Sequence, residues 1–233
     1  FDGDTVNLGV LAGEGVSLFT VTVENDVPVQ SLTEIRGIVE EEAIDNDRSS
    51  GNQDDSDLEG MVEDNDADNR KASGSLDGVV NVGADEEASY SLSSDTSSLD
   101  DQGLTSGNQA LRYSVEGTTL TGYVESEDAE GLDDEDRVVF TLELEGTNNS
   151  KFTFTLDDQL DHARLDNEAG DDSENSLAID LSGMIVATDG DGNSLVADEG
   201  SVLVTVQDDI PALSIDTQTG EAVTTGGVVN EDA

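Results

Sequence analysis

The chain has 233 residues, of which 56 are acidic and only 8 basic, so its formal net charge is −48. This charge repels nucleic acid and anionic membrane surfaces, and we expect neither nucleic-acid binding nor membrane insertion. The absence of cysteine excludes a disulfide framework. Aromatic residues make up 3% of the chain, which predicts a thin core. An acidic chain without disulfides can gain stability from a hard cation, and Ca2+ is the candidate cofactor.

A strand followed by a stiff linker is predicted near each end of the chain. Residues 16–23 alternate between apolar and polar and run into residues 23–28 (VENDVP). The pattern returns at residues 206–211 (VQDDIP), and the only two prolines of the chain end these two copies. Proline cannot donate to a strand ladder and holds the preceding residue extended. We interpret each copy as the last strand of a repeat and its outgoing linker.

Two further motifs recur in the same order. The acidic turn at residues 2–5 (DGDT) returns at 191–194 (DGNS), and the opening motif at 37–43 (GIVEEEA) returns at 227–233 (GVVNEDA). This order predicts three segments: residues 1–29 as the C-terminal end of a preceding repeat, 30–211 as a complete repeat, and 212–233 as a linker and the start of the next. The acidic stretch at about 40–70 is either a solvated insert or a loop ordered by ions.

Short strands separated by turn signals fill the rest of the complete repeat. We predict them at residues 79–82, 89–92, 111–115, 119–124, 138–144, 151–156, 177–181, 184–187 and 202–206. Glu116-Gly117 predicts a tight hairpin and residues 145–150 a longer one. No stretch shows a helical stripe, so the predicted fold class is all-β, an antiparallel β-sandwich.

The turn at Asp189-Gly190-Asp191-Gly192-Asn193 has the spacing that opens an EF-hand loop. The sixth-position glycine and twelfth-position glutamate of that loop are absent, because Ser194 and Gly200 stand there. We therefore predict a simpler acidic turn that binds Ca2+ through Asp189, Asp191 and Asn193, with Asp2 and Asp4 as the matching positions of the preceding repeat. The alternative is a plain type I or I′ turn between two strands.

The acids beside the two linkers are a second set of candidate Ca2+ ligands. Carboxylates from neighbouring repeats of the chain can share an ion and fix the angle between the repeats. This predicts one junction at Glu24, Asp26, Glu40 and Glu42, and another at Asp208, Asp209, Glu231 and Asp232. The alternative is solvated acid that keeps edge strands from associating.

We expect no enzymatic activity and assign no catalytic residue. His162 is the only histidine, and no cysteine or second histidine is present to build a relay or a transition-metal site, so we interpret it as a turn cap. A glycosidase carboxylate pair needs an apolar or aromatic cleft, and the chain has no tryptophan and three tyrosines.

Residues 152–162 (FTFTLDDQLDH), 187–192 (ATDGDG) and 206–211 (VQDDIP) resemble signatures of modules in giant RTX-type bacterial adhesins exported by type I secretion. The similarity covers most of residues 75–233 and the first 28. It implies an Ig-like or cadherin-like β-sandwich at the bacterial cell surface that binds Ca2+ in loops and linkers. Such repeats project a distal ligand-binding region for surface attachment and biofilm formation. Asn193 departs from the family pattern, and the glycine-rich nonapeptide repeats are absent, as expected of an internal repeat.

Two other functions stay open. One is a self-assembling extracellular fibre or matrix subunit, in which residues 1–28 donate strands to an identical subunit. The other is a ligand-binding adhesion module, which needs an exposed aromatic cluster or a flat regular array, and neither is evident in the sequence. For the extender repeat, low cytosolic Ca2+ would keep the chain unfolded for export.

Overall fold

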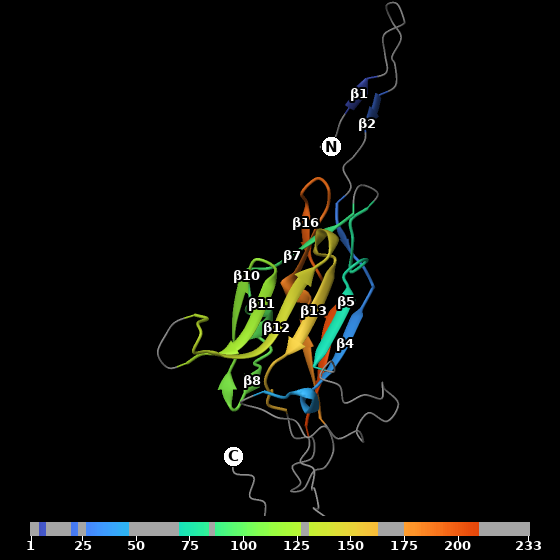
Figure 1. The fold of residues 1–233 in the computed structure, drawn as a ribbon. Helices are drawn as coiled ribbons and strands as arrows, with labels where there is room; N and C mark the ends of the chain where they lie inside the picture. Colours follow the sequence, from blue (N-terminus) through green and yellow to red (C-terminus); the bar gives the residue numbers. More distant parts are fainter. Residues whose placement is uncertain are drawn as a thin grey trace, which may run out of the picture.

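The computed structural model describes residues 5–7, 20–22, 27–46, 70–83, 87–126, 131–162 and 175–209. These ranges consist mainly of strands, which confirms the all-β sandwich (Figure 1). The helical pieces are short: α1 (Ser97–Asp100), η1 (Glu41–Ala43), η2 (Thr147–Asn149) and η3 (Ser182–Met184). Within these ranges, no helix is long and apolar enough to span a membrane.

The larger sheet has five antiparallel strands. Their order is β10 (Arg112–Glu116), β11 (Thr119–Val124), β12 (Arg137–Glu145), β13 (Lys151–Leu156) and β5 (Lys71–Ser75). The predicted tight hairpin is present, and Gly117 has the positive φ of 61° that its turn requires. Phe152, Phe154 and Leu156 are buried on one face of β13, as the alternation predicted. The sheet thus supplies one apolar wall of the core.

Shorter sheets form the opposite side of the core. One contains β14 (Ser176–Asp180), β17 (Val202–Gln207) and β4 (Ile35–Glu40), and another β16 (Ser194–Val196), β15 (Ile185–Thr188) and β7 (Ser89–Leu92). Three small pairs are β1 (Thr5–Asn7) with β2 (Thr20–Thr22), β3 (Val29–Gln30) with β6 (Val80–Asn81), and β8 (Thr105–Ser106) with β9 (Gln109–Ala110). Val204 and Val206 of β17 join the same buried cluster as Phe154 of the larger sheet.

The strands β4 and β17 pair in parallel, whereas every other described pair is antiparallel. The register runs from Ile35 opposite Val202 to Glu40 opposite Gln207. Parallel partners end at the same edge of a sheet, so the residues that follow Glu40 and Gln207 are neighbours. From the sequence, residues 29–36 were interpreted only as a lead to Gly37 within an antiparallel architecture, so this parallel pair was not predicted.

β5 was also missed, because its small and polar residues carry little of the β-branched and aromatic signal of a strand. The packing explains the composition. A Cβ on Gly37 of β4 would lie 2.7 Å from the Cβ of Ala72 in β5. A Cβ on Gly74 would lie 2.8 Å from the ring of Phe152. Small residues are therefore needed in two places, where β4 approaches β5 and where β5 lies beside the ring of Phe152 in its own sheet.

The division into a complete repeat and two flanking pieces stays a prediction. Most of residues 1–26, the acidic residues 47–69 and residues 210–233 lie outside the described ranges. β1 begins at Thr5, and the repeat aligns this residue with Ser194, where β16 begins. β2 falls in the segment that the repeat aligns with β17. β1 pairs with β2, whereas β16 and β17 belong to different sheets, so these short strands do not test the proposed repeat.

Replacing Leu142 by alanine tests the buried core. Leu142 is 0% exposed in β12, whereas Leu32 is fully exposed. We expect Leu142→Ala to lower the free energy of unfolding by about 2–5 kcal/mol, through lost apolar burial and a residual cavity. Leu32→Ala, the matched control, should change it by less than about 0.5 kcal/mol. Urea denaturation measures both, and equal effects would contradict this core.

A double-mutant cycle tests the approach of β4 to β5. Gly37→Ala should destabilise the protein by about 1–3 kcal/mol, since its Cβ would overlap that of Ala72. Ala72→Gly removes the overlapping atom, so adding it to Gly37→Ala should recover much of this loss in thermal denaturation. Additive losses from the two substitutions would show that the two strands do not meet at this point.

Candidate metal centre

Five acidic residues meet where β4 and β17 end. Glu40 is the last residue of β4, and η1 continues directly with Glu41 and Glu42. Asp208 and Asp209 follow the last residue of β17, which is in register with Glu40. We call these five residues, Glu40–Glu42 with Asp208 and Asp209, the carboxylate end. The parallel pairing of the two strands brings them together.

The three glutamates of the carboxylate end are buried, with 7%, 5% and 4% of their surface exposed for Glu40, Glu41 and Glu42. A carboxylate is costly to bury unless hydrogen bonds or an opposite charge compensate it. The chain has only 8 basic side chains for 56 acids, so most of its carboxylates cannot have one as a partner. Such an environment favours cation binding.

Glu41 makes the best-defined contacts of this group. Its Oε1 atom accepts a hydrogen bond of 2.7 Å from the backbone N–H of Leu160 and lies 3.2 Å from Nε2 of His162. The side chains of His162 and Glu41 are 3% and 5% exposed. Asp161, the residue before His162, fixes the loop that follows β13, because it accepts hydrogen bonds from the backbone N–H groups of Gly107 and Asn108. His162 therefore reaches across to Glu41, and the turn-cap interpretation misses this contact.

The pKa values of Glu41 and His162 show that the pair favours holding a proton. Burial raises the pKa of Glu41, against hydrogen bonds from His162 and Leu160 that lower it. Burial lowers the pKa of His162, but the hydrogen bond to Glu41 and the negative charges of Glu41, Asp208 and Asp161 outweigh it, so this pKa is raised. A bound cation would supply positive charge at the same place.

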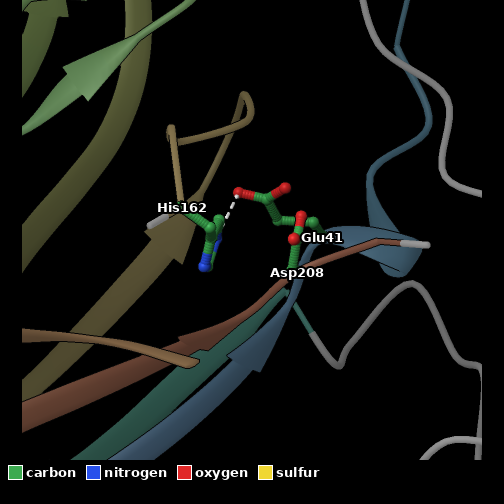
Figure 2. Close-up of side chains that lie close together, drawn as sticks. All are labelled: Glu41, His162 and Asp208. Atoms are coloured by element: carbon green, nitrogen blue, oxygen red, sulfur yellow. Dashed lines mark hydrogen bonds and ion pairs between the residues drawn. The ribbon is translucent and has the colours of Figure 1, made fainter. Parts of the chain in front are cut away.

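Asp208 completes a group that can hold a metal ion (Figure 2). One ligand atom from each of Glu41, His162 and Asp208 lies within 4.8 Å of the others. Figure 2 shows that they come from three segments: η1, the loop after β13 and the end of β17. Of these residues the sequence analysis predicted only Asp208. Glu41 and His162 were missed because no spacing signal connects residues so far apart in the chain.

The turn at residues 189–193 has a different geometry. Oδ1 of Asp189 accepts hydrogen bonds from the backbone N–H groups of Asp191 (3.0 Å) and Asn193 (2.8 Å), and Oδ2 accepts one from Nδ2 of Asn193 (3.0 Å). These bonds, led by the Asn193 side chain, lower the pKa of Asp189. Both carboxylate oxygens thus already have donors, as in the plain-turn alternative. An ion at Asp189 would have to displace them, so Ca2+ binding here stays a prediction.

The remaining predicted ligands divide into two sets. Glu40, Glu42 and Asp209 belong to the carboxylate end. Six others lie outside the described residues: Asp2, Asp4, Glu24, Asp26, Glu231 and Asp232.

The linker before the complete repeat arrives at the opposite end of the sandwich. Gln30, two residues after Pro28, donates from Nε2 to the carbonyl of Val196 (2.6 Å) and accepts from the N–H of Asp198 (3.1 Å). Glu40 is the last residue of β4, and the 6 residues of that strand span about 16–17 Å from Ile35 to Glu40. The structure therefore groups Glu40 and Glu42 with Asp208 and Asp209, an arrangement that the sequence analysis did not predict.

Comparisons with protein-family models, with curated proteins and with solved structures found no match for this chain.

The hydrogen bonds of Asp189 predict a pH-dependent contribution to stability. We expect Asp189→Ala to lower the melting temperature at pH 7, because two backbone N–H groups of the turn lose their acceptor. The folded-state pKa is lowered, so this contribution is complete above the unfolded pKa of about 3.9 and is lost as the pH falls through the folded value. Melting curves between pH 7 and pH 3 should show the difference from wild type shrinking below about pH 4.

The exposed neighbour Glu199 provides the control, since Glu199→Ala removes a carboxylate without removing this acceptor. A difference between wild type and Asp189→Ala that stays constant at every pH would contradict the assigned role.

Proposed function

We propose that this chain is an extracellular, Ca2+-binding extender repeat of a large RTX-type adhesin on the bacterial cell surface, exported by type I secretion. It acts as a spacer that projects a distal ligand-binding region for attachment and biofilm formation. The observation that supports this function is the carboxylate end. Acids gather there at the point where the chain leaves the last strand of the sandwich, next to the predicted linker.

The mechanism follows from the charge. Without cations, repulsion among the carboxylates and a net charge of −48 oppose a fixed exit of the chain from β17. Extracellular modules bind Ca2+ with dissociation constants of about 0.1–1 mM. At about 5 mM Ca2+, one such site stabilises the folded state by about 1–2 kcal/mol. Neutralised carboxylates would then hold the ends of β4 and β17 and the start of the linker in one geometry.

The fold also refines which acids would share an ion. The sequence analysis assigned Glu40 and Glu42 to the junction with the preceding repeat. Their burial beside the end of β17 favours a site within one repeat, together with Asp208 and Asp209. Such a site would stabilise the start of the outgoing linker. It needs no strand donation and no second subunit.

Thermal unfolding with and without Ca2+ tests this function. We expect about 5 mM CaCl2 to raise the melting temperature by about 2–8 °C over that in EDTA, with a weaker effect of Mg2+. The double variant Glu42→Gln/Asp209→Asn should lose most of this rise. Glu143→Gln, on the exposed face of β12, should keep it. Circular dichroism measures all the transitions.

An absent Ca2+ response, or an equal response in the double variant and the control, would sink the Ca2+ proposal. Light scattering on the same samples separates the remaining alternatives. A monomer is expected of an extender repeat, whereas Ca2+-dependent polymers would favour the self-assembling fibre.

A further inference from the structure

We propose that Glu41, His162 and Asp208 form a cation site of a second kind, which prefers a borderline transition metal of the Zn2+ class to Ca2+. This inference does not rest on the Ca2+ function, because it depends on a nitrogen ligand, and the two proposed sites share only Asp208. The site would link the two layers of the sandwich at the carboxylate end.

The ligand set carries the metal preference. Ca2+ takes six to eight oxygen ligands, whereas imidazole nitrogen suits Zn2+ and its neighbours in the transition series. Zinc sites with three protein ligands are built from histidine and carboxylate side chains, with water at the fourth position. One histidine and two carboxylates fit that class.

The spacing of the ligand atoms fits a small ion. Two ligands of a tetrahedral zinc ion, each about 2.0–2.1 Å from the metal, lie about 3.3 Å apart. Oε1 of Glu41 and Nε2 of His162 are 3.2 Å apart, which matches that edge. An oxygen of Asp208 completes the group within 4.8 Å, so only a modest movement of this side chain is needed.

Unsatisfied buried atoms at the same end give independent support. Nδ1 of His162, Oδ1 of Asn175 and Oε1 of Gln207 are buried without a hydrogen-bond partner. Asn175 is 7% exposed, and its carbonyl accepts the backbone N–H of Asp208 at 2.9 Å. Gln207 immediately precedes Asp208. Buried polar atoms without partners are rare. With Nε2 of His162 as the metal ligand its Nδ1 would carry the proton, so the free lone pairs are those of the two amide oxygens, on residues that flank or contact the backbone of Asp208.

The backbone already holds the ligands in place. The N–H of Leu160 fixes Glu41, and Asn175 fixes the backbone at Asp208. His162 follows β13 of the five-stranded sheet, whereas Glu41 and Asp208 follow β4 and β17 of the opposite layer. A metal bound to all three would therefore cross-link the layers, as a disulfide could in a chain with cysteine.

The test is a Zn2+ titration of the 233-residue chain, monitored by isothermal titration calorimetry. The buffer contains about 5 mM CaCl2, so that Ca2+ occupies unspecific carboxylate sites. We expect one Zn2+ to bind per chain, and we expect this binding to persist in the presence of Ca2+. His162→Gln should weaken this binding at least 10-fold, whereas Glu143→Gln should leave it unchanged. The Ca2+-dependent rise in melting temperature should survive in His162→Gln. Equal Zn2+ binding by both variants, or complete competition by Ca2+, would overturn the proposal.

A measurement on the unmodified chain covers the case in which His162→Gln does not fold. His162 is the only histidine, so its imidazole signals in a proton NMR spectrum are unambiguous. One equivalent of Zn2+ should shift these signals, and Co2+ should move or broaden them strongly. Unchanged imidazole signals at saturating metal would exclude His162 as a ligand, whatever the outcome of the Ca2+ experiment.

Discussion

The parallel pairing of β4 with β17 is the constraint on which the candidate site depends. Both strands end at one edge of their sheet, so an opening motif rich in glutamate and a closing motif rich in aspartate become neighbours. Antiparallel pairing of the same strands would place Glu40 beside the start of β17 and separate these acids by the length of the strand. β4 and β17 thereby bring the two acidic motifs to one edge of their sheet.

Acidic residues have two different roles in the described structure. Asp136 and Asp189 accept backbone N–H groups in turns, and these hydrogen bonds lower their pKa values, so each is stable as a carboxylate without a cation. Glu41 is in the opposite situation, because burial raises its pKa. A cation would gain most where burial outweighs the hydrogen bonds that the protein supplies, as it does at Glu41. This contrast favours a cation at Glu41 over one at the turn at 189–193, although that turn has the more familiar sequence spacing.

The sequence predicted the elements whose signals are local. The alternation in β13 and the Glu116-Gly117 turn each depend on neighbouring residues, and the structure confirms both. β5 was missed because its small residues are selected by the approach of β4, a contact between different segments. The contact between Glu41 and His162 has the same origin, since it joins residues 121 positions apart. A single sequence contains no local pattern from which such a contact can be read.

A chain without cysteine has no disulfide to fix this end of the sandwich, where two features need to be held. One is the separation of the two layers, and the other is the direction of the outgoing chain. A site with a nitrogen ligand at Glu41, His162 and Asp208 would hold the two layers together, because its ligands come from both layers. Oxygen-only binding at Glu40, Glu42 and Asp209 would fix the direction of the outgoing chain, because these residues flank the end of β17. Cations of different chemistry would thus meet the two demands, with Asp208 as the one ligand common to both proposed sites.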